Sequence, residues 1–523
     1  MPGSRETPLA RPKRVFNLHS WTGLALGWLV YVICASGTAA VFANELETWA
    51  TPELRFDLPA DPASMDQVFP TWVDTHADKG EINDANLYFP NIAHPYYRGE
   101  ILFRDGQTET QIWAPDTLAE VPNQGQSSAT WLLEFHRHLH WPKLIGGQTL
   151  GRILTGLIGI ILGLSLLSGV VALRKIRAQL FKLRLKRSVR LMWQDTHNTL
   201  SLWSLPFSAM IAVTGMFIGL VAIILPLQAV LSTKGDMALI SQSLRPPITE
   251  PTGLSGPQLR LDQLLETGDI ATPLRATFRN WGDEEALIEI AYPERSKLAS
   301  ERLLTRKGMT GEIVDNVRLG HDGSASGRTL LAFSALHFGT FQGVAVKLLY
   351  LPLGAILCII IAFGNTMWIE RRLHGKIGSR TPITYERMSR VNIGLCAGLP
   401  LATAMALQAD MLIDMAPSLR QTVVGYIYFG SIISAIMYAF FPKNSYIAAR
   451  HVLFVTGALC ALLPLTNWAM TGDNFVSDLF GAAPAHAWAD FCFLVIGIAM
   501  IIFALKLPMR RPLRKQEHAD GDI

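Results

Sequence analysis

Long uncharged apolar runs alternate with polar stretches along the chain. An α-helix needs about 20 apolar residues to cross a hydrocarbon core of about 30 Å, and eight runs approach this length. They cover residues 21–43, 153–173, 200–227, 344–369, 391–408, 421–441, 452–470 and 487–505. The pattern predicts a polytopic α-helical membrane protein with about eight transmembrane helices.

The first run could also belong to a cleaved signal peptide, since Ala40-Val-Phe-Ala43 resembles a cleavage site. The apolar segment of a signal peptide usually spans about 7–15 residues. Because the first run is longer than that, we interpret it as a membrane-spanning helix.

Two polar stretches interrupt the first half of the chain, at residues 44–150 and 232–340. Each combines a short helical segment with strand-like segments and turn signals. The predicted helices cover 66–77 and 259–266, and the predicted strands cover 85–89, 100–104, 110–113, 274–279, 286–291 and a hairpin over 303–314. We therefore expect two α+β insertions outside the membrane.

Basic residues gather in segments that all fall on one side of the membrane if the eight runs are helices. These segments are the N-terminal tail, the block at 174–190, the loop at 371–390, Lys443 with Arg450, and the C-terminal tail. Short cytoplasmic loops carry an excess of Lys and Arg, so we expect a multi-pass membrane protein, N-in and C-in. The block at 174–190 also predicts contact with anionic lipids; docking of an acidic redox partner is the alternative.

This orientation divides the chain into six parts. They are residues 1–43 (cytoplasmic tail and first helix), 44–150 (first periplasmic insertion), 151–231 (two helices joined by the basic loop), 232–340 (second periplasmic insertion), 341–369 (fourth helix) and 370–523 (a four-helix extension with a basic cytoplasmic tail).

Composition and motifs limit the classes of protein and of cofactor site that the chain can contain. Half of the 523 residues are hydrophobic and 17% are charged, less than a soluble chain of this length carries. All five Cys lie in apolar runs, and no CxxC or CxxCH motif supports a c-type haem. No GxGxxG fingerprint or P-loop occurs, so the sequence predicts no dinucleotide site of its own. If the chain carries electrons, its donor would be a membrane quinol or a separate protein. We expect no nucleic-acid partner.

A histidine stands at the start of each of the first four runs or shortly before it. Two of these positions fall on the inner face and two on the outer face. A haem with two axial imidazoles needs one from each of two facing helices, and helix bundles supply such pairs. The inner positions are His19 and His197, and the outer ones are His337 and the cluster His136, His138 and His140.

Two other interpretations of these histidines stay open. A histidine near a helix end is often only an interfacial residue. His136 and His140 also stand four residues apart, which would place them on one helical face where they could bind a metal ion. The many glycines of these runs fit close helix packing or a flat macrocycle equally well.

Several motifs together carry a family resemblance. They are Phe16-Asn-Leu-His19-Ser-Trp-Thr-Gly-Leu, Leu133-Glu-Phe-His136-Arg-His-Leu, Leu150-Gly-Arg152, His197-Asn-Thr-Leu-Ser-Leu-Trp-Ser-Leu-Pro206 and Leu336-His-Phe-Gly339. Over roughly 10–370 the chain resembles the PepSY-associated transmembrane helix family, which includes bacterial inner-membrane ferrisiderophore reductases. The insertions are then expected to be PepSY-like.

The resemblance implies two b-type haems and outward electron transfer to a ferric siderophore or another ferric chelate. It implies His19, His136, His197 and His337 as the iron ligands and includes Arg152 among the cofactor-binding residues. His140 is the alternative to His136, because Trp141-Pro142 and Gly146-Gly147 interrupt the approach to the second run.

Two rival functions follow from the same sequence. The chain could be a non-enzymatic PepSY membrane protein whose insertions bind a partner or peptide. A transporter is the other rival, but no acidic pair lies inside a run, and residues such as Asp410 and Asp490 sit in or beside loops. Haem in the purified protein would favour the reductase hypothesis over the partner-binding hypothesis.

Overall fold

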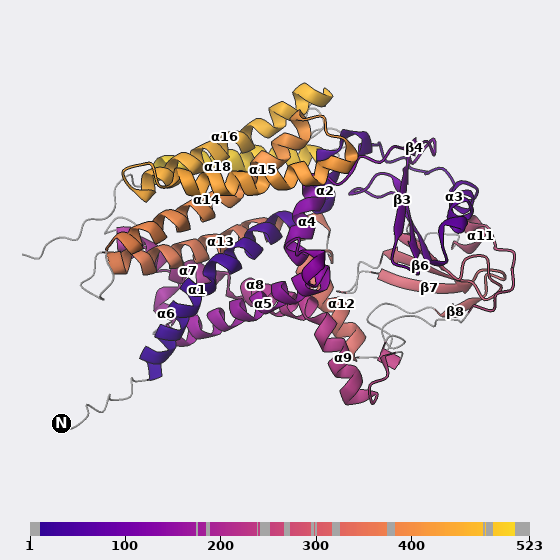
Figure 1. The fold of residues 1–523 in the computed structure, drawn as a ribbon, viewed down its shortest axis with the longest axis horizontal. Helices are drawn as coiled ribbons and strands as arrows, with labels where there is room; N and C mark the ends of the chain where they lie inside the picture. Colours follow the sequence, from indigo (N-terminus) through magenta and orange to yellow (C-terminus); the bar gives the residue numbers. More distant parts are fainter. Residues whose placement is uncertain are drawn as a thin grey trace, which may run out of the picture.

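The computed structural model describes residues 11–173, 176–184, 189–237, 239–240, 251–265, 272–293, 298, 301–315, 325–341, 343–373, 382–473, 476 and 485–507. Long helices lie side by side next to one β-sheet (Figure 1). Within the described ranges, seven helices are long and apolar enough to cross a membrane, and a bent helix pair raises the number to eight if it is one span. The predicted fold class is therefore confirmed.

The core bundle contains the first four predicted runs. Its elements are α1 (Arg11–Ala40), α5 (Gly147–Ala172), the bent pair α7 (Val189–Trp203) and α8 (Leu205–Gly219), and α13 (Val344–Leu373). We call the end where α1 finishes at Ala40 the sheet end, because the β-sheet lies there, and the end where α1 begins the far end (Figure 1).

The third run is not one helix, as the sequence predicted. It is divided into α7, α8 and α9 (Val221–Ser232), and α7 and α8 meet at a bend of 68°. Pro206 stands in the first turn of α8. Proline lacks an N–H and its ring clashes with the preceding turn, so a straight helix cannot continue through this point.

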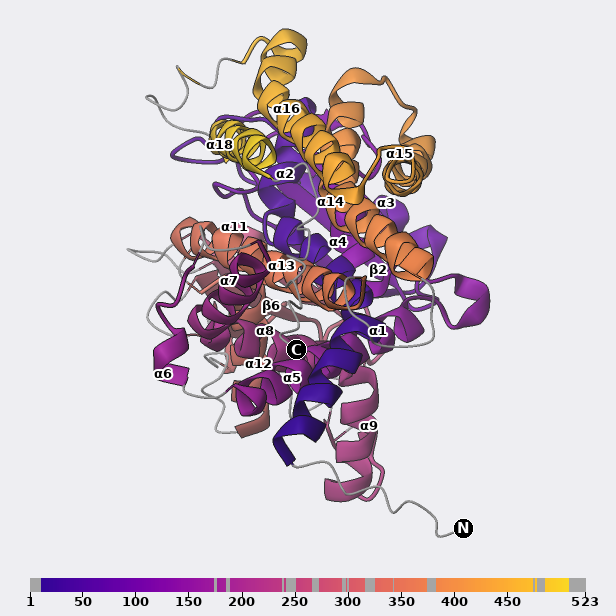
Figure 2. The ribbon, with the colours of Figure 1, turned by 90° about the vertical axis from the view of Figure 1, so that its left-hand side faces the viewer.

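A second bundle follows the core and corresponds to the predicted extension. It consists of α14 (Pro382–Leu412), α15 (Pro417–Tyr438), α16 (Ser445–Thr471) and α18 (Ala485–Lys506). It stands on one side of the core bundle, with α14 nearest to α13 and α1 (Figure 2).

Three short helices stand at the sheet end: α2 (Ala43–Ala50), α4 (Ser128–His138) and α12 (Ala325–Phe338). The second and fourth histidine positions lie just before the spans α5 and α13, as the sequence predicts, and they belong to the last turns of the separate short helices α4 and α12. Leu139 and His140 adopt φ values of 56° and 47°, and Gly339 one of 66°. These left-handed residues end the short helices before the spans begin.

The two insertions form one domain and not two. Their strands build a single eight-stranded sheet in the order β4-β3-β2-β1-β5-β6-β7-β8. The strands are β1 (Ile82–Tyr88), β2 (Tyr97–Phe103), β3 (Thr108–Trp113), β4 (Glu120–Val121), β5 (Arg275–Arg279), β6 (Leu287–Pro293), β7 (Glu301–Lys307) and β8 (Ile313–Asp315). Antiparallel pairing of β1 with β5 joins the halves and removes the open edge that each would otherwise present.

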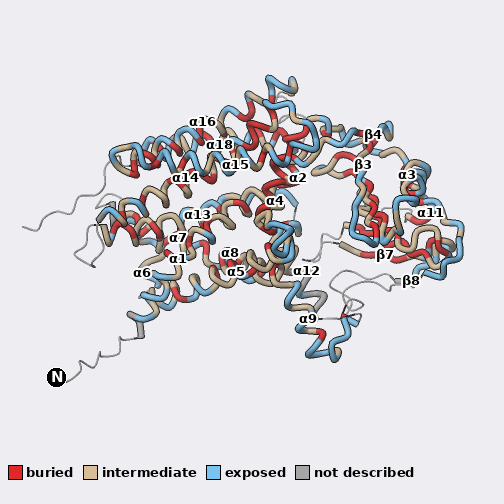
Figure 3. The backbone as a smooth tube through the Cα atoms, in the orientation of Figure 1, coloured by how far each residue is buried: buried red, intermediate tan, exposed pale blue. Residues whose placement is uncertain are grey.

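Each half of the sheet domain contributes a helix followed by four strands. The helices α3 (Val68–His76) and α11 (Leu261–Leu264) cover the face of the sheet that points away from the bundle (Figure 1). Phe69 and Leu264 pack there against Ile101 and Ile290 in one buried core. Figure 3 shows this burial in the sheet domain and along the facing sides of the helices.

Candidate functional site

The first histidine pair lies at the far end of the core bundle. His19 of α1 and His197 of α7 face each other, with ring centroids 6.4 Å apart and ring planes at 57°. Two imidazoles that bind one metal ion from opposite sides, at about 2.0–2.1 Å each, have ring centres roughly 6 Å apart. The separation therefore fits two axial ligands of one iron.

The second pair lies at the sheet end. His136 of α4 and His337 of α12 have ring centroids 6.2 Å apart and ring planes at 21°. The separation again fits a shared metal ion. On α1, His19 and the residue that contacts His136, Gly37, are 18 positions apart, so the two pairs are separated by roughly 27 Å along the helix axis.

All four imidazoles are held through Nδ1. The acceptors are Ser165 O for His19 (3.0 Å), Ile33 O for His136 (3.1 Å), Ile360 O for His197 (2.9 Å) and Thr214 Oγ1 for His337 (3.0 Å). The Thr214 hydroxyl itself donates to Met210 O at 2.7 Å, so it accepts the His337 proton. A proton on Nδ1 leaves the lone pair on Nε2, as in metal-bound histidines. Among the described residues, none of these Nε2 atoms forms a hydrogen bond.

Each of the four rings also packs against a glycine of a neighbouring helix. A Cβ atom added at these glycines would lie 3.1 Å from Cε1 of His19 at Gly169, 2.6 Å from His136 at Gly37, 3.0 Å from His197 at Gly364 and 3.0 Å from His337 at Gly215. A side chain at these positions would crowd the imidazole and displace it from its observed place. Sequence reasoning missed these contacts.

A repeated sequence signal accompanies these glycines. In three of the four helices the residue before the glycine carries a hydroxyl group next to the imidazole Nδ1: Ser36, Ser168 and Thr214. Phe363 takes this place before Gly364. A Ser-Gly or Thr-Gly pair inside an apolar run could have been recognised from the sequence.

His138 and His140 do not face His337. The Nε2 of His138 lies 2.5 Å from Glu134 Oε2, and the Nε2 of His140 donates to Trp131 O at 3.0 Å. The ring of His140 also packs on Trp131, with centroids 4.6 Å apart. His136 is therefore the member of the cluster that the fold brings to His337.

The metal-ion interpretation of His136 and His140 gains no support. Because α4 ends at His138, the two residues do not share a helical face. In the part of the chain that the structure describes, no group of three or more His, Cys, Asp or Glu side chains could hold a metal ion.

Burial keeps the second pair neutral. It lowers the pKa of His136 to about 4 and that of His337 to about 3. Both residues are on short helices outside the candidate spans. Neutral imidazole is the form that ligates iron.

Arg152 lies in the second turn of α5, at the sheet end. Its side chain is half-buried. No hydrogen bond, ion pair or ring contact joins it to the histidines within the described ranges. Arg152 therefore shares the sheet end of the bundle with the second pair, but no contact joins it to the pair.

The space between the pairs is apolar. Side chains from all four core elements fill it: Val30, Ile158, Leu162, Ala212 and Leu357. A layer of buried apolar side chains therefore separates the two ends of the core bundle.

These features define a multi-pass α-helical membrane protein with two facing histidine pairs in one bundle and a β-sheet domain at one end. The chain belongs to the family of the PepSY-associated TM region, which matches residues 16–371. The matched region contains all four paired histidines and ends within α13, so the extension lies outside it.

The chain is also similar to Uncharacterized protein PA4219 of Pseudomonas aeruginosa. The two are 28% identical over 362 residues, which cover 65% of this chain and 88% of the relative.

Proposed function

We propose that the protein binds two b-type haems and passes electrons across a bacterial inner membrane to a periplasmic ferric complex, as a ferrisiderophore reductase does. One observation carries the proposal: two histidine pairs with the ring spacing of axial ligands stand at opposite ends of one bundle. His19 and His197 would hold one haem, and His136 and His337 the other. Each haem supplies a one-electron redox centre.

The residues of the chain perform three tasks in this proposal. The acceptors at Nδ1 fix the tautomer of each histidine and keep Nε2 available for iron. The glycines leave room for each ring to approach its partner. The apolar layer between the pairs excludes water, which keeps protons and bulk solvent out of the electron path.

The direction of transfer follows from the charge pattern. Arg14, Arg371 and Arg372 lie at the far end, which supports a cytoplasmic far end, N-in and C-in, with the sheet domain in the periplasm. An electron that leaves the negative interior gains about 2.3 kcal/mol per 100 mV of membrane potential. Hard oxygen ligands bind Fe(II) less tightly than Fe(III), so reduction would release iron from a chelate.

The electron donor lies outside this chain in the proposal. A membrane quinol or a separate protein would reduce the first pair's haem, and the basic block at 174–190 would contact anionic lipids. The ferric siderophore or other chelate would accept electrons at the sheet end.

The proposal is tested by a reduced-minus-oxidised spectrum of the purified protein with haem stoichiometry. We expect two b-type haems per chain and reduction of an external ferric chelate in vesicles. Protein that inserts correctly but contains no haem would contradict the proposal and leave a membrane protein whose sheet domain binds a partner.

A further inference from the structure

The N-terminus of α4, the helix that carries His136, is capped by a residue of the extension. Ser127 is the N-cap residue of this 11-residue helix. The next backbone N–H, that of Ser128, donates to Asp410 Oδ2 of α14 at 2.5 Å. A carboxylate at this position satisfies a free amide and complements the positive end of the helix dipole.

Arg420 of α15 holds Asp410 in place. Its Nε donates to Asp410 Oδ1 at 3.0 Å, and the Asp410 side chain is 0% exposed. The same guanidinium donates to Ala50 O at 2.8 Å and to Gln124 O at 3.1 Å. One ion pair of the extension thus joins the end of α2, the segment before α4 and α4 itself.

An apolar contact continues along α4 toward His136. Side chains of α4 pack in one buried cluster with side chains of α14 and α15: Trp131, Leu132 and Phe135 with Ala402, Ala406, Val424 and Tyr428. Phe135 is the residue before His136. The extension therefore contacts α4 from its first turn to its last.

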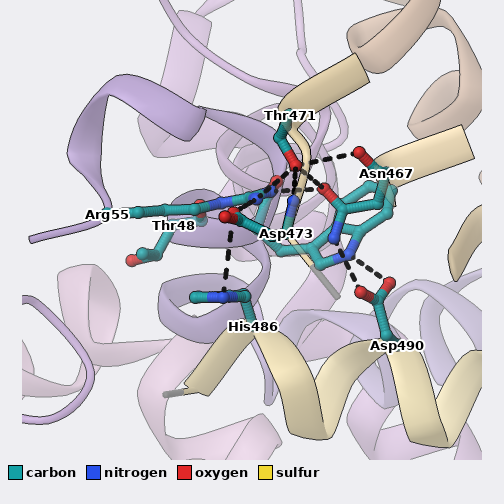
Figure 4. A network of polar contacts seen from close by, with 8 residues as sticks. Thr48, Arg55, Asn467, Thr471, Asp473, His486 and Asp490 are labelled. Atoms are coloured by element: carbon teal, nitrogen blue, oxygen red, sulfur yellow. Dashed lines mark hydrogen bonds and ion pairs between the residues drawn. The ribbon is translucent and has the colours of Figure 1, made fainter. Parts of the chain in front are cut away.

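A second polar network fixes α2 to the other half of the extension (Figure 4). The indole of Trp49 donates to Asp490 Oδ1 at 2.7 Å, and Asn467 donates to Asp490 Oδ2 at 2.6 Å. Arg55, which follows α2, donates to Asp473 at 2.6 Å and to Asn467 Oδ1 at 2.9 Å. These contacts tie α2 to α16 and α18.

The helix α2 in turn contacts the first turn of α4. Glu47 of α2 accepts hydrogen bonds from the hydroxyl groups of Ser127 and Thr130. The two networks therefore converge on the same turn of α4, one directly and one through α2.

We propose that Asp410 and Arg420 are positioning residues of the second histidine pair and that the extension acts through α4 to set the place and ring angle of His136. This inference rests on the proposed function and deepens it, because it assigns a task to the residues beyond the family match.

The test is the double variant Asp410→Leu/Arg420→Met in the full chain. Removing both partners leaves neither charge of this pair buried without the other, so the bundle is expected to fold. The matched control is Glu386→Leu/Arg390→Met. This pair belongs to the same helix α14 and Arg390 also donates to loop carbonyls, of Ala439 and Pro442, but it lies at the far end.

Three readouts are compared with the wild-type protein: haem per chain, the two midpoint potentials, and the EPR signal of each ferric haem. The EPR signal depends on the angle between the axial imidazole planes. In Asp410→Leu/Arg420→Met we expect an unchanged first haem, together with a second haem that is lost or has an altered EPR signal and potential. The control variant should match the wild type.

The outcomes are distinct. A wild-type chain without haem overturns the proposed function. If the wild type binds two haems and Asp410→Leu/Arg420→Met retains both with unchanged signals, only the positioning role is overturned. Loss of both haems, or the same change in the control variant, also overturns it, because the effect would then not be specific to α4.

Discussion

The two histidine pairs use the same local design in different surroundings. Both have ring centroids just over 6 Å apart, Nδ1 atoms bound by a neighbouring helix, and a glycine behind each ring. They differ in how the helix before the span is anchored. In the first pair, Asp195 of α7 accepts from Arg184 at 2.7 Å, a partner only 11 residues away. In the second pair, the corresponding ion pair is that of Asp410 and Arg420, which belong to the extension.

The geometry of the paired rings is therefore separate from the contacts that anchor the helix carrying the histidine. The first pair is complete within the family-matched region. The second pair obtains its two histidines there as well, but α4 is capped by α14 and α15. Under the proposed function, the extension would therefore act on the second site through α4.

The largest expected effect comes from removing the paired rings. His19→Ala or His197→Ala should eliminate the first haem and retain the second, and His136→Ala or His337→Ala should do the reverse, because each haem needs both axial ligands. Reduction of an external ferric chelate should stop in all four variants, since the pairs act in series. Haem per chain and chelate reduction are measured together.

The controls for this prediction are His138→Ala and His140→Ala, whose rings contact Glu134 and Trp131 instead of His337. Both should retain two haems. If all four variants of the paired histidines keep the wild-type haem content, these residues are not the ligands.

A smaller effect is expected when a glycine behind a ring gains a side chain. In Gly37→Ala the new Cβ would lie 2.6 Å from Cε1 of His136. Overpacking of this kind costs about 1–3 kcal/mol, equivalent to a roughly 5- to 150-fold weaker retention of the second haem. Haem loss to apomyoglobin measures this retention.

Gly23→Ala is the matched control on the same helix, because nothing lies within 4 Å of a Cβ at Gly23. The two variants have the same composition. Equal haem retention in both would show that the contact between Gly37 and His136 has no influence on the site.

The smallest expected effect concerns the hydrogen-bond acceptors at Nδ1, which differ between the two pairs. Thr214→Val removes the acceptor at Nδ1 of His337, which makes the imidazole a weaker electron donor and stabilises Fe(II). The potential of the second haem should rise by tens of millivolts, on the order of one hydrogen bond. A redox titration followed in the visible spectrum measures the shift.

Ser168→Ala should change the first haem less, because His19 keeps the Ser165 carbonyl at 3.0 Å while the Ser168 hydroxyl lies 3.4 Å away. A larger shift in Ser168→Ala than in Thr214→Val would contradict this ranking.

Features that repeat locally could be predicted from the sequence. Apolar runs predict the spans, and the predicted short helix and strands of each insertion lie close to observed elements, as for β5 at Arg275–Arg279. The two-residue strand β4 was not predicted. The grouping of His19 with His197, and of the outer cluster with His337, followed from alternating helix direction. The structure brings these rings together; their role as iron ligands stays a prediction.

Features that depend on distant contacts could not be predicted. Pairing of β1 with β5 has no local signal, so the sequence predicts two insertions but not the single sheet that they share. The family resemblance implied His136, with His140 as the alternative, and only the structure shows that Leu139 and His140 adopt the left-handed conformations that end α4. The sequence predicts Asp410 in or beside a loop, but it lies in the last turn of α14 with its side chain buried, and only the packed bundle shows what it caps.

The shared sheet also determines when its two halves can pair during synthesis of the protein. Asp84 of β1 lies opposite Arg279 of β5, and the helices of the core that separate them in the sequence must enter the membrane before the two strands can meet. At about 5–20 residues per second, the edge of β1 waits roughly 10–40 s for its partner. During that interval it is open to pairing with other extended chains, so biogenesis is exposed to mispairing at this strand.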